Sequence, residues 1–189
     1  MFNIVNRCQN SFGYFTSVLM AFSAAVAIVS FIQLHLDGAY GITGAISNVN
    51  PTVNVKFTRR FGSTDGKAKE NARLTFDLET DLAPLFNWNT KQVFVQLTAE
   101  YPGARPDISN RVTFWDKIVK RKEDSVLSLS NSRGRYSVYD TGKSFNEKNA
   151  TLRLEWNVQP YVGLLTYGEV LLDGDTSFQF PALRAAKEN

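Results

Sequence analysis

The N-terminal part of the chain contains one long run without charge. Between Arg7 and Asp37, residues 8–36 include no Lys, Arg, Asp or Glu. A bilayer hydrocarbon core roughly 30 Å thick is crossed by about 20 predominantly apolar helical residues. Residues 12–34 supply such a stretch. We therefore predict a membrane-spanning signal anchor at residues 12–34, followed by a more polar part that can fold in water.

A cleaved secretory signal is the alternative interpretation of this run. The run lies near the N-terminus and contains small residues at 25–27 that resemble a cleavage site. Signal peptides, however, have an apolar core of about 7 to 15 residues. Here apolar character continues past the small residues as far as Leu34, and this length favours an uncleaved anchor.

The charges on either side of the run predict its orientation. Arg7 and the α-amino group lie on the N-terminal side, whereas Asp37 lies on the other side and no cation follows until Lys56. Cationic flanks remain in the cytosol. We therefore predict that residues 1–11 are cytosolic and that residues 35–189 form a translocated, lumenal domain.

The lumenal part shows the period-2 pattern of β-strands. Leu74, Phe76 and Leu78 alternate with polar residues, and the same alternation runs through residues 92–101. Further strands are predicted at residues 52–58, 112–120, 126–129, 135–139, 151–159, 164–172 and 177–180. No long amphipathic helical pattern competes with them. Many short strands without intervening helices predict a mainly β fold, a single antiparallel β-sandwich domain after one helix.

Two connecting segments have distinct predictions. Between residues 79 and 92 we expect a turn or one short helical turn, capped by Asp81, with three apolar side chains facing inward: Leu82, Leu85 and Phe86. Residues 61–72 are rich in Gly, Lys and Asp and are predicted to be the least ordered part. The cations in and around this segment would be solvated or contact lipid headgroups: Arg59, Arg60, Lys67, Lys69 and Arg73.

The inventory of reactive side chains argues against catalysis and against nucleic-acid binding. The net charge is +3, and its cations and anions are interspersed, which is typical of a solvated surface. The only histidine, His35, lies at the end of the predicted span, so no Ser-His-Asp triad is predicted. A Ser-Lys dyad is not formally excluded. No Cys/His cluster has zinc spacing, and Asp77, Glu79 and Asp81 alternate along a strand as solvated groups. We predict no metal or cofactor.

One motif predicts a covalent modification. Asn149-Ala150-Thr151 is an Asn-x-Thr sequon, whereas Asn50-Pro51-Thr52 is blocked by its proline. Glycosylation of such a sequon requires lumenal exposure. Asn149 follows Lys148 at a predicted turn, and it falls in the part assigned to the lumen. The only thiol, Cys8, lies on the cytosolic side, so the lumenal domain is expected to fold without disulfides.

Three tryptophans are each followed by an Asn or Asp. These pairs are Trp88-Asn89, Trp115-Asp116 and Trp156-Asn157, and Lys91 and Lys117 lie close to the first two. Tryptophan suits both a packed core and a binding surface. Core packing is the simpler interpretation, and contact with a protein partner is the alternative. We therefore keep these eight residues as candidate contact residues.

Three blocks together resemble one protein family. LTFDLETDLAPLFNWNTKQVFVQLTAEY (residues 74–101), VTFWDKIV (112–119) and NATLRLEWNVQPYVGLL (149–165) resemble subunit 3 of the eukaryotic signal peptidase complex, its glycosylated accessory subunit. The similarity covers nearly the whole chain. It is weak over residues 37–72, and the tail at residues 183–189 is not diagnostic. Asn149 coincides with the glycosylation position that the family leads us to expect.

The resemblance implies a function and a set of partners. It implies a single-pass protein of the endoplasmic-reticulum membrane that supports removal of signal peptides, while the nucleophile belongs to another subunit, a serine protease. The expected partners are that catalytic subunit, the small membrane subunits of the complex, and the translocation channel. Its role would be to position the catalytic subunit. The alternatives are a catalytic contribution, for instance from Lys91, Asp116 or Lys117, and a lumenal receptor or chaperone for extended chains.

Overall fold

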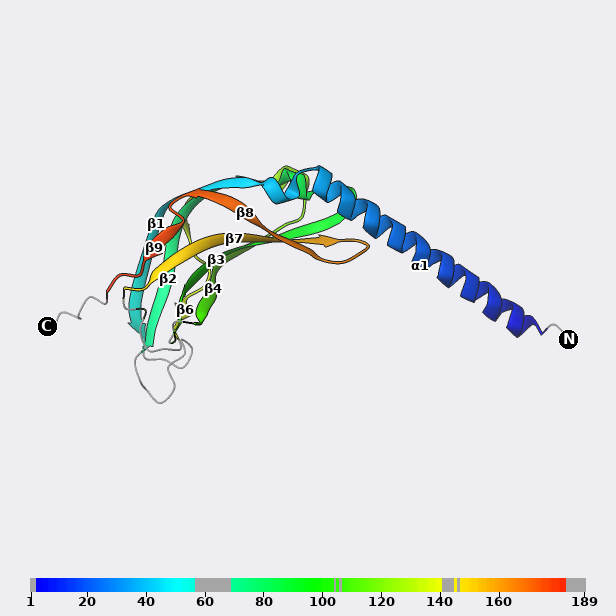
Figure 1. The fold of residues 1–189 in the computed structure, drawn as a ribbon, viewed down its shortest axis with the longest axis horizontal. Coiled ribbons are helices and arrows are strands. Elements are labelled where there is room, and N and C mark those ends of the chain that lie inside the picture. Colours follow the sequence, from blue (N-terminus) through cyan, green and yellow to red (C-terminus); the bar gives the residue numbers. More distant parts are fainter. Residues whose placement is uncertain are drawn as a thin grey trace.

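The computed structural model describes residues 3–56, 69–103, 105, 107–140, 145 and 147–182. One α-helix projects from the end of a strongly curled β-sheet (Figure 1). The elements are α1 (Ile4–Leu36), η1 (Ala39–Gly41), β1 (Thr43–Lys56), β2 (Lys69–Asp81), η3 (Ala83–Leu85), β3 (Thr90–Pro102), β4 (Ser109–Val119), η4 (Lys122–Asp124), β5 (Val126–Arg133), β6 (Val138–Tyr139), β7 (Asn149–Pro160), β8 (Thr166–Gly174) and β9 (Ser177–Gln179).

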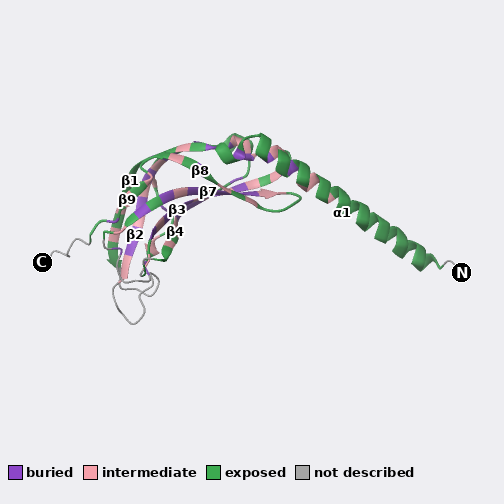
Figure 2. Cartoon of the chain, in the orientation of Figure 1, coloured by how far each residue is buried: buried purple, intermediate pink, exposed green. Residues whose placement is uncertain are grey.

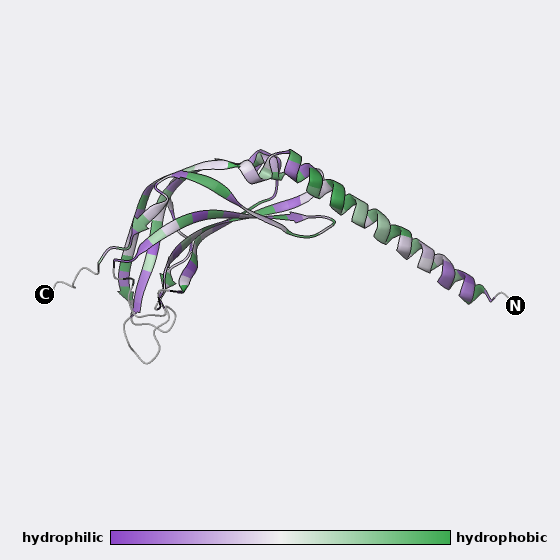
Figure 3. Ribbon diagram, viewed as in Figure 1, coloured by the Kyte–Doolittle hydropathy of each residue, from purple (hydrophilic) through white to green (hydrophobic). Residues whose placement is uncertain are grey.

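Helix α1 is long and apolar enough to cross a membrane. Its side chains are almost all exposed, except near its C-terminal end, where Ser30 and Leu34 are buried (Figure 2). Apolar residues cover most of its length, and polar residues gather near its N-terminal end (Figure 3). The helix has 33 residues, which is about 50 Å at a rise of 1.5 Å per residue. It therefore extends beyond a hydrocarbon core of roughly 30 Å.

The strands form one continuous sheet in the order β4-β3-β7-β8-β1-β2-β5, with β6 paired to β2 and β9 to β7. The prediction of a mainly β domain after one helix is confirmed. The sandwich is approximate, because its two halves are joined into one sheet. The prediction of purely antiparallel pairing is wrong for one pair, since β1 and β8 run parallel from Thr43 beside Leu171 to Ile46 beside Gly174. Both strands start at the end of the domain next to α1, which gives them the same direction.

The core fills the inside of the curl. The alternation predicted in β2 and β3 is confirmed, because Phe76, Leu78, Val93 and Val95 are all 0% exposed. The Phe76 and Trp115 rings meet in a T-shaped contact with 6.0 Å between their centroids, so side chains from the two halves of the sheet meet directly. These contacts make the curled sheet a single packed unit.

The segment after β5 closes the curl. The Gly134 amide donates to the Leu74 carbonyl of β2 at 2.7 Å, and the Tyr136 amide donates to the Phe114 carbonyl of β4 at 3.1 Å. A Cβ atom on Gly134 would lie 3.0 Å from both carbonyl oxygens, so only glycine fits this crossing easily. Of the strand predicted at 135–139, only Val138–Tyr139 pairs as β6, because the preceding residues bridge β2 and β4.

Two predictions in the first half of the domain need correction. The first strand begins at Thr43 rather than at Thr52. Its early part lacks clean alternation because a bulge interrupts the register between Ser47 and Asn50. Residues 61–68 of the segment predicted to be least ordered lie outside the described residues, but residues 69–72 begin β2, and Ala72 is fully buried.

The five cations predicted in and around residues 61–72 fall partly within the described residues. Arg59, Arg60 and Lys67 lie outside the described residues, whereas Lys69 and Arg73 belong to β2. The Lys69 ammonium lies over the Tyr139 ring, 4.9 Å from its centroid.

The turn between β2 and β3 is confirmed. Residues 83–85 form one short 3-10 turn, and the Asp81 carboxylate accepts a hydrogen bond from the Ala83 amide at 2.8 Å. Leu82 and Leu85 are fully buried, and Phe86 packs against the core. The turn carries β3 back into the sheet next to α1.

Asp77 links the three strands β1, β2 and β5. Its carboxylate accepts hydrogen bonds from the Asn48 side chain and from the Asn131 amide, the latter at 2.5 Å. Both asparagines have positive φ angles, 53° and 48°, and each lies where the strand pairing with β2 shifts register. The hydrogen bonds from Asn48 and Asn131 lower the pKa of Asp77. Asp77, predicted to be only solvated, thus holds two bulges in place.

Candidate functional site

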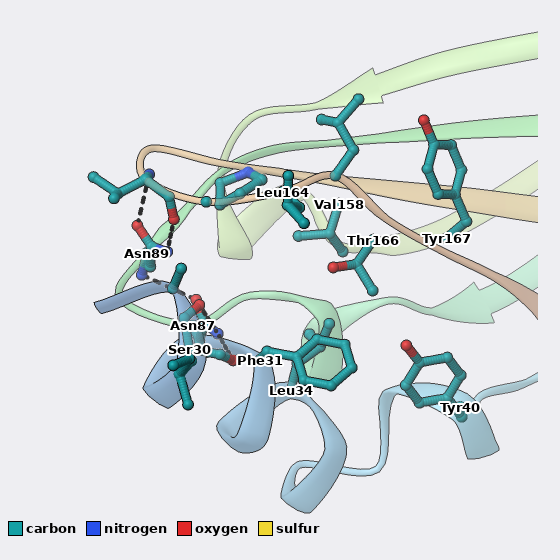
Figure 4. Close-up of a pocket in the computed structure, with 16 residues that line it drawn as sticks. Ser30, Phe31, Leu34, Tyr40, Asn87, Asn89, Val158, Leu164, Thr166 and Tyr167 are labelled. Atoms are coloured by element: carbon teal, nitrogen blue, oxygen red, sulfur yellow. Dashed lines mark hydrogen bonds between the residues drawn. The ribbon is translucent and has the colours of Figure 1, made fainter. Parts of the chain in front are cut away.

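The end of the sheet next to α1 brings together three segments that are far apart in sequence. We call this region the junction: residues 27–34 of α1, the turn at residues 87–89 before β3, and the β7–β8 turn at residues 161–165 (Figure 4). Its contacts decide how the sheet is held relative to the helix.

Asn87 ties the sheet to the helix. Its side-chain Nδ2 donates to the carbonyl oxygen and to the hydroxyl of Ser30, both at 3.1 Å. Its Oδ1 accepts from the Asn89 amide at 2.9 Å and from the Thr90 hydroxyl at 3.0 Å. One side chain therefore orders the turn before β3 and holds α1 against it.

Asn89 ties the same turn to the β7–β8 turn. Its Nδ2 donates to the Val162 carbonyl at 2.7 Å, and its Oδ1 accepts from the Val162 amide at 3.1 Å. Its backbone carbonyl accepts from the Tyr161 amide at 2.8 Å. Asn89 is only 3% exposed. The candidate contact residue Asn89 is therefore an internal connector.

Trp88 adds a third connection and still presents its ring to the outside. Its indole Nε1 donates to Oε1 of Gln33 on α1 at 2.7 Å, and the residue is 57% exposed. Lys91, two residues into β3 from Asn89, is exposed. Of the first candidate group, Trp88 and Lys91 are available to a partner.

A groove of about 520 Å³ lies between α1 and the β7–β8 turn. Figure 4 shows Phe31, Leu34 and Tyr40 on one side and Val158 and Leu164 on the other. Its polar wall is made by Ser30, Asn87 and Asn89, whose side chains bond to one another or to the Val162 backbone. The remaining wall is mostly apolar, so the groove suits an apolar chain rather than a charged or reactive ligand.

Trp156 supports the junction from inside the sheet. It is 2% exposed, and its ring lies 5.5 Å from that of Tyr40 between centroids. A Cβ atom on Gly168 of β8 would lie 2.2 Å from Cζ2 of Trp156, so the ring occupies the space above that glycine. Within the described residues, the Trp156 indole nitrogen and the Asn157 amide nitrogen lack hydrogen-bond partners. Trp156 is a packing residue, as the simpler interpretation predicted.

The second candidate group, Trp115, Asp116 and Lys117, lies on β4, at one end of the strand order. Trp115 packs in the core, and Asp116 is 9% exposed, with its Oδ2 3.5 Å from the Arg135 guanidinium. A hydrogen bond to Asp116 raises the pKa of Tyr136. Lys117 is half-buried. None of these side chains lines the groove, so the structure does not bring the three tryptophan pairs into one site.

The predicted glycosylation site lies at the opposite end of β7 from the junction. Asn149 is the first residue of β7, beside Gln179 of β9, and it is exposed together with Thr151. It is a strand residue, not part of a turn as expected. Its side chain is accessible.

The lone histidine, His35, is exposed and contacts two aromatic rings. The His35 ring lies 5.3 Å from that of Phe31 and 4.6 Å from that of Tyr40, between centroids. Across the ranges that the structure describes, no group of three or more His, Cys, Asp and Glu side chains is arranged to hold a metal ion.

The β7–β8 turn was not among the predicted contact residues. A usable signal was present, because residues 156–168 form a further run without charge. Its two ends were assigned to the strands predicted at 151–159 and 164–172, and only the position of the turn beside α1 makes it a candidate site.

The sequence matches known proteins over nearly its whole length. A family model described as signal peptidase subunit matches residues 1–183. The chain is 48% identical to signal peptidase complex subunit 3 of Debaryomyces hansenii, over 95% of this chain and 94% of that protein. It is 48% identical to the subunit 3 of Saccharomyces cerevisiae, over 90% and 93%, and 34% identical to that of Drosophila melanogaster, over 96% of each.

Proposed function

The chain belongs to the signal peptidase subunit family, and on that premise we propose that it is a non-catalytic, structurally required subunit of the complex. It supports the removal of signal peptides from preproteins during translocation. Its β domain positions and stabilises the lumenal part of a separate catalytic serine-protease subunit. The other partners are the small membrane subunits and the translocation channel.

The direct bonding of α1 to the sheet is the observation that carries this proposal. Only residues 37–42 separate α1 from β1, and the Asn87–Ser30, Asn89–Val162 and Trp88–Gln33 hydrogen bonds lock the junction. A domain held this firmly keeps a fixed height above a membrane. Height matters for a protease, because misplacing a reacting bond by about 1 Å costs roughly 100-fold in rate.

The proposed topology is a single-pass protein of the endoplasmic-reticulum membrane. Residues 1–11 are cytosolic, residues 12–34 form an uncleaved signal anchor, and residues 35–189 are lumenal. The exposed sequon at Asn149 supports this topology and is the proposed glycosylation site. In microsomes, glycosidase treatment should increase gel mobility, and Asn149→Gln should abolish that shift. A protein without glycan would argue against the lumenal assignment.

Partner identification separates this function from the receptor or chaperone alternative. Native purification in mild detergent should recover a serine-protease subunit in stoichiometric amount. Recovery of diverse extended polypeptides without a protease would favour the alternative.

Single substitutions separate positioning from chemistry. Lys91→Ala and Lys117→Ala should change signal-peptide cleavage only in proportion to any change in assembly, since these side chains are outside the junction and the core. Asp116→Asn should affect cleavage only in proportion to any loss of assembled complex. Abolished cleavage in a fully assembled complex would instead indicate that this chain supplies a catalytic group.

A further inference from the structure

We propose that the β7–β8 turn is a second membrane contact, which inserts into the lumenal leaflet beside α1. This inference rests on the proposed function in one respect, that α1 is the membrane anchor. The occupant of the surface formed by the turn and the groove is the lipid bilayer itself.

The exposed side chains of the turn are those that lipid accommodates. Leu164 is 89% exposed, Tyr161 69%, Leu165 51% and Tyr167, at the start of β8, 66%. Residues 156–168 carry no charge. Burying a large apolar side chain is favourable relative to leaving it in water. Four such side chains on one hairpin indicate a surface that is covered in the working protein.

The position of the turn along α1 sets its depth. Gly163 packs on the helix, since a Cβ atom there would lie 2.9 Å from Cβ of Ala27. Trp88 bonds to Gln33, six residues later, and Tyr40 contacts His35. Tryptophan and tyrosine concentrate at the membrane–water interface. With these aromatic rings at the interface, the turn reaches about 9 Å deeper along the helix axis. Interfacial elements insert by about 5–10 Å.

The first part of the turn, residues 161–162, has its backbone groups bonded within the protein. Peptide groups without a hydrogen-bond partner are strongly unfavourable in hydrocarbon. The Tyr161 amide and both peptide groups of Val162 are bonded to Asn89. Asn89 therefore supplies, from within the protein, the hydrogen bonds that water would supply elsewhere.

The shape of the hairpin favours lipid over a partner protein. Leu164 has the largest exposed fraction in the hairpin, and Tyr161 and Tyr167 flank it on the two sides of the turn. A protruding aliphatic tip between amphipathic rings fits a fluid layer, in which hydroxyl groups reach the headgroups. A protein partner remains a distinguishable outcome of the test.

The test measures the depth of single fluorescent labels on the full-length chain. In a Cys8→Ser background, Leu164→Cys, Phe22→Cys and Val55→Cys are labelled with a small dye and reconstituted in phosphatidylcholine vesicles. Nitroxide groups on the acyl chains quench from within the bilayer, and iodide quenches from water. Phe22 reports on the middle of α1, where it is 68% exposed, and Val55, 39% exposed on β1, reports on the end far from α1.

We expect lipid quenching at 164 and at 22 but not at 55, with iodide quenching at 164 several-fold weaker than at 55. Lipid quenching at 22 together with iodide quenching at 164 as strong as at 55 would overturn the inference. That result would still support α1 as the membrane anchor. No lipid quenching at 22 would overturn the anchor and the inference together. A label at 164 that is shielded from both quenchers in the purified complex would show that a protein covers the turn, which would also overturn the inference.

Discussion

The two ends of the β domain satisfy their buried polar groups by different chemistry. At the junction the connecting groups are neutral, namely the amides of Asn87 and Asn89 and the hydroxyl of Ser30. At the far end they are charged. The Lys148 ammonium lies 2.9 Å from the carboxylate of Asp140, whose side chain is 2% exposed, and the Glu70 carboxylate accepts from the Phe145 amide at 2.7 Å.

The difference follows from the surroundings of each end. Transferring an unpaired charge into an apolar medium is far more costly than transferring an amide that keeps its hydrogen bonds. Neutral connectors therefore suit the end beside the apolar helix. At the far end, paired charges are tolerated, and burial together with the Asp140 carboxylate raises the pKa of Tyr101. The side chains that connect segments are thus neutral at the junction and charged at the far end of the domain.

The largest expected effect tests the packing beneath the junction. Trp156→Ala should lower the free energy of unfolding by about 3–5 kcal/mol, because it empties a fully buried ring site. Chemical unfolding of the full chain in detergent micelles, followed by circular dichroism, measures this. Trp88→Ala is the matched control, and we expect a loss below about 1 kcal/mol because that ring is 57% exposed. Equal losses would contradict the assignment of Trp156 as a core residue.

The next effect tests the charged end. Lys148→Met should cost about 3 kcal/mol in the same assay, because it leaves the Asp140 carboxylate buried without its cation. The double variant with Asp140→Asn should recover part of that loss, since it removes the uncompensated charge. Additive losses in the double variant would show that the pair does not stabilise the far end as a unit.

A smaller effect tests the neutral end. Asn89→Ala should cost about 1–3 kcal/mol, because both peptide groups of Val162 lose their partner. Asn54→Ala, at an exposed position of β1, should stay within about 0.5 kcal/mol. If the junction positions the domain, Asn89→Ala should also reduce signal-peptide cleavage at temperatures where the variant is still folded. Unchanged cleavage would separate the junction from function.

The smallest effect concerns a charge on the flank between the two ends. The pKa of Asp77 is lowered in the folded protein by Asn48 and Asn131. The ionised Asp77 therefore adds to the free energy of unfolding above its unfolded-state pKa of about 3.9. This contribution is lost as the pH falls through the lower folded-state pKa. Asp77→Asn should flatten this acid dependence below about pH 4 in unfolding titrations. Glu79→Gln, two residues along β2, is the control. In that variant the loss of stability below about pH 4 should be steeper than in Asp77→Asn.

The sequence was most informative where one face of a strand is buried. The alternation around Phe76 and Val95 correctly predicted strand positions and faces, because burial imposes a period of two. The capped turn at Asp81 was equally predictable, since its signals are local. The long N-terminal helix could be predicted because its apolar run is long enough to cross a membrane.

Other features depend on contacts between distant segments and could not be predicted. The first half of β1 contains a bulge at Asn48 that is held by Asp77, so its sequence lacks alternation. The parallel pairing of β1 with β8 depends on both strands starting at the junction. Asn89 was chosen as a contact residue for its neighbour Trp88, but its role depends on Val162, which no local pattern connects to it.

The parallel pairing of β1 with β8 has a consequence for the order of synthesis. β1 leaves the ribosome soon after α1, but its partner residues on β8 are made only after most of the domain. At about 5–20 residues per second, β1 waits on the order of ten seconds with one edge open. An open strand edge invites wrong partners. The nascent chain is therefore most prone to wrong strand pairing before β8, its last long strand, has been synthesised. A translational pause late in the mRNA would prolong that interval.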